Sequence, residues 1–325
     1  MGAYFSRAST AEATKLIFQN QQDLTSHITR ILSIRPTHDL PPEDIALFKS
    51  HTEAPYAIIT ESTIFHPQGG GQPSDTGSIR CGSTIFNVSA VRKTDAGVVL
   101  HVGTFDGPAT MQTAGEVVQE INGERRALNS KYHTAGHILS HAVQQVTGAT
   151  LAKAYLVPGE ASVTFKERLG EEVREQIQEV LDEIVRSDIL VEGYWLDGGE
   201  AKRRVTAGWE RYTVSDGEQV RVVEVKGLDM QVCGGTHVRR TKELGRIIVR
   251  KLARKNGLSV VGFEVVSSLG GISSGEGKVV RGGAKKLEIQ EQTLTEPGVD
   301  NKVALRKAKK LEKQEKKRKK MIESL

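Results

Sequence analysis

Two short motifs place metal-ligand residue types at matching intervals: His133-Thr-Ala-Gly-His137 and, far along the chain, Cys233-Gly-Gly-Thr-His237. The apolar spacing of residues 131–147 predicts a helix, on which positions four apart lie on one face, one turn from each other. Two imidazoles so placed can point at the same ion, and Cys233 with His237 can complete its coordination. One cysteine and three histidines suit tetrahedral zinc. The sequence therefore predicts one Zn²⁺ ion held by His133, His137, Cys233 and His237.

Three other interpretations of these residues are ordinary packing histidines, a metalloprotease site and a structural zinc. Paired histidines on a helix also occur at ordinary packing or surface positions, but a second pair in a chain with only two cysteines and nine histidines favours a metal. Thr134 stands where a His-Glu-x-x-His metalloprotease has its general base, so we do not expect peptide hydrolysis. Four protein ligands are typical of a structural zinc, and the sequence leaves open whether this ion is catalytic.

A glycine-rich segment, Phe65–Gly77, is the second region whose residues could take part in binding or catalysis. Its glycines and prolines predict a backbone that turns tightly and exposes amide groups. Such a loop can approach a phosphate or ribose closely at Gly70 and Gly71, with Gln72 and Asp75 as hydrogen-bonding side chains. The same composition also fits a tight loop at a barrel corner. The tripeptide Gly70-Gly71-Gln72 occurs in peptide-release factors too, but the surrounding sequence lacks their other features.

The elements that position these residues predict an α+β fold. Residues 15–105 contain short apolar runs separated by turn residues, which predicts a small antiparallel β-barrel. A charged helix is expected over residues 116–131, running into the histidine helix. Residues 171–187 carry one apolar helical face. With the intervening strands, they predict a two-layer α/β domain with an antiparallel sheet. The strands are expected within residues 151–166, 191–196, 220–225, 245–252 and 262–266.

The predicted organisation has five parts along the 325 residues. Residues 302–325 hold eleven Lys or Arg and three Glu, so the net charge of +5 comes from a basic tail and leaves about −3 for the remainder. Such a tail can contact phosphates, but it equally suits solubility or nuclear entry. The parts are an unstructured N-terminus at 1–12, a barrel domain at 13–110, a zinc-binding domain at 115–268, a Gly/Ser-rich linker at 269–284 and a basic helical tail at 285–325.

The composition indicates the cellular compartment in which the protein is expected. Cys81 and Cys233 lie far apart, so no disulfide framework is expected and a reducing compartment fits best. No run of eighteen apolar residues and no signal-peptide core is present, which predicts a cytoplasmic protein. Gly2 with Ser6 matches the minimal N-myristoylation pattern, and whether it is modified stays open.

The glycine-rich loop, the histidine pair and Val232-Cys-Gly-Gly-Thr-His-Val238, taken in this order, resemble the editing region of alanyl-tRNA synthetases. With a barrel in front and no aminoacylation domain, the chain resembles the free-standing AlaX-type alanyl-tRNA editing proteins. The resemblance covers residues 15–268. The second half is also similar to the editing module of threonyl-tRNA synthetases, but the glycine-rich loop favours the alanyl branch.

The resemblance implies trans-hydrolysis of mischarged tRNA(Ala), mainly seryl-tRNA with glycyl-tRNA as a further candidate, at the zinc site. Zinc can lower the pKa of water or polarise the ester carbonyl while backbone amides stabilise the oxyanion. Discrimination requires a hydrogen bond to the serine hydroxyl, for which Gln72 and Thr150 are the candidates. The leading alternative is a non-catalytic, zinc-stabilised tRNA- or RNA-binding module, and a regulatory protein is the weaker one. The expected contacts to tRNA are Gly70, Gly71, Asp75, Lys131, Arg239 and Arg240.

Overall fold

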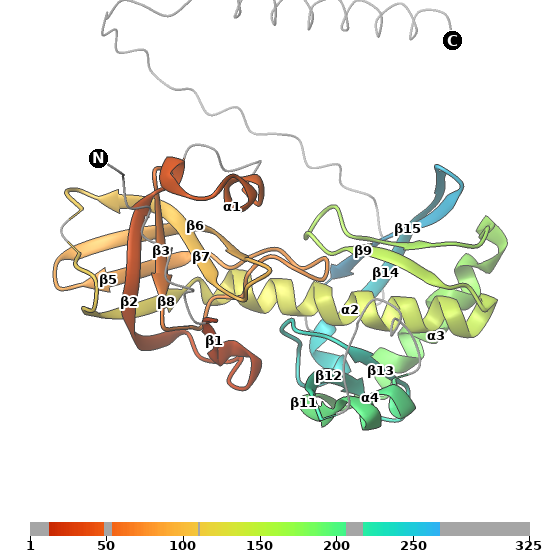
Figure 1. The fold of residues 1–325 in the computed structure, drawn as a ribbon. Helices are drawn as coiled ribbons and strands as arrows, with labels where there is room; N and C mark the ends of the chain where they lie inside the picture. Colours follow the sequence, from red (N-terminus) through yellow and green to blue (C-terminus); the bar gives the residue numbers. More distant parts are fainter. Residues whose placement is uncertain (1–12, 49–53, 110, 206–216, 267–325) are drawn as a thin grey trace, which may run out of the picture. The chain divides into compact units, whose positions relative to one another are not determined.

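The structure is a computed structural model, and the residues that it describes fall in one compact unit (Figure 1). The predictions for the N-terminus, including Gly2, and for the linker and basic tail lie outside these residues. No helix in the described part of the chain has the length and apolar character needed to cross a membrane. The described ranges are 13–48, 54–109, 111–205 and 217–266.

The predicted barrel is present and closed, with six antiparallel strands in the order β2-β3-β7-β6-β5-β8. Alternating side chains fill its interior, and Phe86 pairs with Ile79 on one side and Phe105 on the other. The strands are β2 (Ser26–Pro36), β3 (Tyr56–Thr60), β5 (Gly77–Cys81), β6 (Thr84–Lys93), β7 (Val99–Asp106) and β8 (Glu116–Ile121). The short strands β1 (Lys15–Leu16) and β4 (Ser62–Thr63) pair in parallel beside it, and the short helical segments of this half are η1 (Ile17–Gln19), η2 (Thr37–Asp39) and α1 (Pro42–Ala46).

The strand β8, which closes the barrel, lies where the sequence predicted the start of a helix. The stretch 116–131 was predicted to be one charged helix, but Glu116–Ile121 is β8 and pairs with both β2 and β5. Val117, Gln119 and Ile121 are buried at alternate positions, which is the period of a strand facing a core. The barrel therefore continues past the predicted boundary at residue 110.

The histidine helix is confirmed as α2 (Gly123–Thr147), the long helix at the centre of the view (Figure 1). The Asn122 side chain accepts a hydrogen bond from the backbone N–H of Arg125 at 2.9 Å and so caps the first turn. At the other end Gly148 adopts a left-handed conformation with φ of 71° and stops the helix. Most of α2 between residues 129 and 143 is buried, including its polar residues Asn129, Ser130, His133, Thr134, His137 and Ser140.

Antiparallel strands and helices pack around α2, as the α+β prediction requires. The apolar side of α2, including Leu139 and Val143, shares one core with Ile177 and Leu181 of α3. The strands form two sheets rather than one, in the orders β14-β15-β10-β9 and β11-β12-β13. These elements are β9 (Leu151–Tyr155), β10 (Ser162–Phe165), η3 (Glu171–Val173), α3 (Arg174–Arg186), β11 (Val191–Asp197), α4 (Gly198–Arg204), β12 (Gln219–Val225), β13 (Asp229–Val232), η5 (Thr241–Leu244), β14 (Arg246–Lys255) and β15 (Leu258–Val266).

Candidate metal centre and its cavity

The fold brings the four predicted ligands together. His133 and His137 lie one turn apart on α2, and Cys233 and His237 come from the loop that follows β13. One ligand atom from each lies within 4.8 Å of all the others, and all four residues are buried. The Cys233 Sγ is 3.5 Å from Nε2 of His133 and 3.3 Å from Nε2 of His237. The donor atoms are therefore gathered around one point, as a single ion requires.

Gln72 fixes the orientation of the His133 ring. Its amide nitrogen donates to Thr236 Oγ1 at 2.9 Å, and its Oε1 accepts from the Thr236 backbone N–H at 3.1 Å. The same Oε1 lies 2.5 Å from His133 Nδ1. An amide oxygen only accepts, so Nδ1 carries the proton and Nε2 keeps its lone pair toward the cluster. Gln72 is fully buried and all its polar atoms are engaged, so it positions a ligand, and we correct its predicted contact with the serine hydroxyl.

Thr134 does the same for His237. Its hydroxyl donates to the Ser130 carbonyl at 3.0 Å, which uses its only proton. The oxygen therefore accepts from His237 Nδ1 at 3.1 Å and from the Val238 backbone N–H at 3.1 Å. Thr134, which stands where a metalloprotease has its glutamate, thus orients His237 and anchors Val238. This role could have been suspected from the position of Thr134 between two ligands.

The Cys233–His237 loop is held by Arg221, a buried cation that the sequence reasoning missed. Its Nη1 donates to the carbonyls of Cys233 at 2.7 Å and Gly235 at 3.0 Å. At Gly235 a side chain is excluded, because an added Cβ would lie 2.2 Å from Cε1 of His133. In the sequence, the one indication of this role is that an arginine interrupts the apolar residues of β12.

The protonation states fit a metal. Burial lowers the pKa of His133 and His237 well below the ordinary value and that of His137 to about 4, so all three rings are neutral near pH 7. Neutral imidazole is the form that binds metals. Burial also raises the pKa of the Cys233 thiol, which the Gly235 backbone N–H and Arg221 partly offset, so zinc would bind with release of the thiol proton. The donor set, its burial and its oriented lone pairs fit Zn²⁺.

A cavity of about 470 Å³ opens beside these ligands. The glycine-rich loop forms one wall, and Gly71 docks it against β9: its carbonyl accepts from Leu156 N at 2.9 Å, and an added Cβ would lie 2.7 Å from the Ala154 carbonyl oxygen. Gly71 has φ of 88°, which glycine adopts without strain. The other lining residues include His66, Gly70, Lys93, His133, Gly136, His137, Ser140, Leu151, Lys153 and Cys233.

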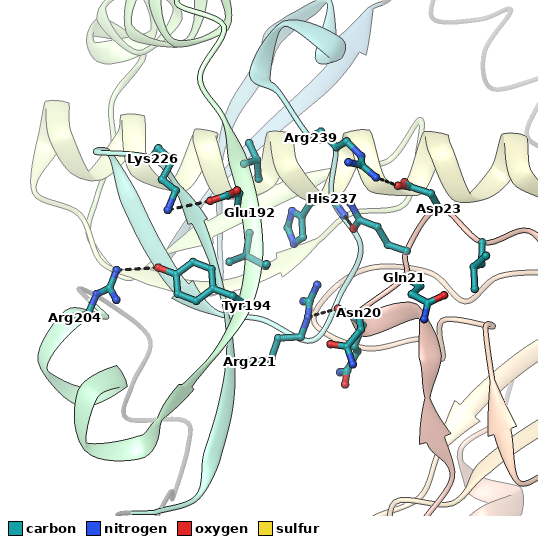
Figure 2. A pocket seen from close by; sticks show the side chains of 16 residues that line it. Asn20, Gln21, Asp23, Glu192, Tyr194, Arg204, Arg221, Lys226, His237 and Arg239 are labelled. Carbon is teal, nitrogen blue, oxygen red and sulfur yellow. Dashed lines mark hydrogen bonds and ion pairs between the residues drawn. The ribbon is translucent and has the colours of Figure 1, made fainter.

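A larger cavity, about 880 Å³, lies on the His237 side, between residues 19–24 and strands β11 and β12 (Figure 2). Its charged side chains are largely paired within the protein. The pairs are Arg239 with Asp23, Lys226 with Glu192 at 3.0 Å, and Arg204 with the Tyr194 hydroxyl at 2.9 Å. Three of the four ligands and the glycine-rich loop meet at the cavity of about 470 Å³, whereas only His237 lines the larger one.

Two predicted contacts are corrected by their surroundings. Asp75 is fully buried, pairs with Arg126 at 3.0 Å (Nε to Oδ2) and accepts the His66 backbone N–H, so it fixes the loop and does not reach a substrate. Thr150 is exposed and outside the cavity, and its amide donates to Glu167 at 2.6 Å. Position after the helix alone suggested Thr150, but the lining of the cavity resumes only at the next residue, Leu151.

The basic residues predicted to contact tRNA lie near His237 or next to a residue that does. Lys131 and Arg239 line a third cavity, of about 280 Å³, next to His237. Arg239 pairs with Asp23, and Arg240 pairs with Asp188 at 2.9 Å (Nε to Oδ1). Their contact with tRNA stays a prediction.

Comparison with known proteins agrees with this geometry. Residues 220–258 match the threonyl and alanyl tRNA synthetase second additional domain, and residues 13–125 match the class II (A) tRNA synthetases. An alanine–tRNA ligase of Halobacterium salinarum is 34% identical over 249 residues, which are 74% of this chain and 26% of the relative. The chain carries an AlaX-like, alanyl-tRNA synthetase-related editing domain.

Other alanine–tRNA ligases match this chain over segments of similar length. The alanine–tRNA ligase of Methanopyrus kandleri is 36% identical over 213 residues, 63% of this chain and 23% of the relative. That of Methanobrevibacter smithii is 25% identical over 279 residues, 79% of this chain and 30% of the relative. The chain thus spans about a quarter of the length of the curated relatives it matches. Cys233 and His237 lie inside the matched editing-related segment, while His133 and His137 lie outside both matched segments.

Proposed function

We propose that this protein hydrolyses the aminoacyl ester of mischarged tRNA(Ala) in trans, seryl-tRNA above all and glycyl-tRNA as a further substrate. The observation that carries the proposal is the oriented, buried four-ligand set beside a cavity walled by the glycine-rich loop. Zn²⁺ at His133, His137, Cys233 and His237 would supply Lewis-acid polarisation of the ester carbonyl or of a water molecule. The proposed partner is tRNA and the proposed location is the cytoplasm.

The chain's own groups have separate tasks in this reaction. Gln72 and Thr134 hold the two imidazole rings with their Nε2 lone pairs inward, so the ligand geometry exists before the substrate arrives. Gly70 and Gly71 line the cavity, and their backbone amides donate no hydrogen bond within the described residues, which suits these amides to the oxyanion of the tetrahedral intermediate. Lys93 and Lys153, exposed on the same cavity, suit the phosphates of the tRNA end.

The second candidate is a zinc-stabilised RNA-binding module without turnover, which the closed four-ligand set favours. Serine release from Ser-tRNA(Ala) separates the two. We expect the wild type to release serine rapidly and to spare Ala-tRNA(Ala), and we expect both Cys233→Ala and a chelated sample to be inactive. A wild type that holds zinc but leaves Ser-tRNA(Ala) intact would refute the deacylase and leave the binding module.

The basic C-terminal residues are proposed to aid tRNA capture. Deleting residues 304–325 removes most of the eleven cations and three carboxylates of this region. We expect the deletion to weaken tRNA binding and reduce its salt dependence, because fewer counterions are released. Unchanged affinity at physiological salt would contradict this role.

A further inference from the structure

One face of α2 forms a wall of the cavity of about 470 Å³ that opens beside the metal ligands. His133, Gly136, His137 and Ser140 all line it, at intervals of three and four residues. This spacing is that of a single helical face. Ser140 therefore stands one turn beyond His137, on the same face as the two metal ligands, and is the next hydroxyl along the wall that leads away from them.

Ser140 differs from the other hydroxyl residues of α2. Ser130, Thr134 and Thr147 each donate to the carbonyl four residues earlier, at 2.9, 3.0 and 2.7 Å. Ser140 makes no corresponding bond, and its side chain has no hydrogen-bond partner among the described residues. The residue is only 7% exposed, so its hydroxyl faces the cavity rather than bulk solvent. A polar group in such a place needs a partner from a ligand or from water.

Apolar side chains pack beside this wall. Leu156 packs directly on the helix, because an added Cβ at Gly136 would lie 2.5 Å from its Cδ2. Leu151 and Ala154 line the same cavity. Lys153 and Gln231 line the cavity as well. A small side chain bound directly against Ser140 would meet hydrocarbon and an unpaired hydroxyl, and this combination distinguishes a hydroxymethyl group from a methyl group.

We propose that Ser140 hydrogen-bonds the side-chain hydroxyl of serine in mischarged seryl-tRNA and so selects serine over alanine. This inference rests on the proposed deacylase function. A bound alanine would exclude water from Ser140 and leave its hydroxyl without a partner, which disfavours the correctly charged tRNA. Ser140 is thus a specificity-determining residue that the sequence motifs did not reveal. It takes the role that Gln72 and Thr150 cannot fill from their positions.

The test compares the full-length, zinc-loaded wild type with Ser140→Ala, Ser140→Thr and Gln144→Ala. Binding is measured calorimetrically with non-hydrolysable amide analogues of 3′-aminoacyl adenosine that carry serine, alanine or glycine. We expect the wild type to prefer the seryl analogue, and Ser140→Ala to lose that preference by about tenfold through weaker seryl binding. Ser140→Thr, which keeps a hydroxyl, should retain the preference, and the exposed Gln144 variant should match the wild type. Zinc content and melting temperature should be unchanged, because the Ser140 side chain makes no hydrogen bond to the part of the chain that the structure describes.

The outcomes distinguish this inference from the function on which it rests. A Ser140→Ala variant that binds the seryl analogue as selectively as the wild type overturns the role of Ser140, while serine release from Ser-tRNA(Ala) by the wild type would still support deacylation. A wild type that neither prefers the seryl analogue nor releases serine overturns both. Loss of binding to all three analogues alike in Ser140→Ala would also overturn the inference, since it would indicate a structural role.

Discussion

Gln72→Leu is the substitution that most directly examines the construction of the metal centre. It keeps a buried side chain of similar size but removes the acceptor of the His133 Nδ1–H, 2.5 Å away, and of the Thr236 backbone N–H, 3.1 Å away. It also removes the donor to Thr236 Oγ1. Both N–H groups are buried and would have no acceptor.

The expected magnitudes follow from these lost bonds. Each unsatisfied buried donor costs about 1–3 kcal/mol, so the free energy of unfolding of the metal-free protein should fall by about 2–6 kcal/mol. His133 would also lose the contact that keeps its Nε2 lone pair inward. Removing an outer-shell partner of this kind typically lowers metal affinity by about 10–100-fold. Gln72→Glu retains an acceptor for both N–H groups, so it should lose much less zinc affinity than Gln72→Leu, while its buried carboxylate carries a stability cost of its own.

Competition with a chromophoric chelator measures the zinc affinity, and urea unfolding of the metal-free protein measures stability. Gln145→Leu, the same substitution at an exposed position of α2, is the matched control and should resemble the wild type. Wild-type zinc affinity in Gln72→Leu would refute the reasoning. Equal losses of zinc affinity in Gln72→Leu and Gln72→Glu would also refute it, because the acceptor at Oε1 would then be irrelevant.

Three further predictions concern positions where the packing leaves little freedom. Gly235→Ala should abolish stoichiometric zinc binding, measured by elemental analysis, because its Cβ would lie 2.2 Å from Cε1 of His133; full zinc occupancy would contradict this. Arg126→Met leaves the carboxylate of Asp75 buried and unpaired, so denaturant unfolding should show a loss of about 3–5 kcal/mol, and a loss below about 1 kcal/mol would be inconsistent with the pair. Burial lowers the pKa of His101 to about 4, so the unfolded chain binds a proton first as the pH falls below 6.5. Stability should therefore decline between pH 6.5 and 4, by up to about 3 kcal/mol more in the wild type than in His101→Gln, and parallel pH profiles would exclude this contribution.

The residue types of the metal centre could be predicted from the sequence because their information is local. His133 and His137 share a helix face through their spacing alone, and Cys233 with His237 repeats the interval in a glycine-containing loop. The barrel and α3 were accessible for the same reason, since each strand or helix carries its own apolar period. The strand β8 was not, because its charged residues obscured a period of two.

The tertiary structure alone decided which residues serve the centre and how. Gln72 contacts His133 across 61 residues of sequence and Thr236 across 164, distances over which no local pattern carries a hydrogen bond. The same holds for Arg221, which binds two carbonyls of the ligand loop, and for Ser140, whose hydroxyl is distinguished only by the partner it lacks. Spacing along the chain determines which ligands can meet. The orientation of their lone pairs depends on contacts between distant segments, and these exist only once the chain has folded.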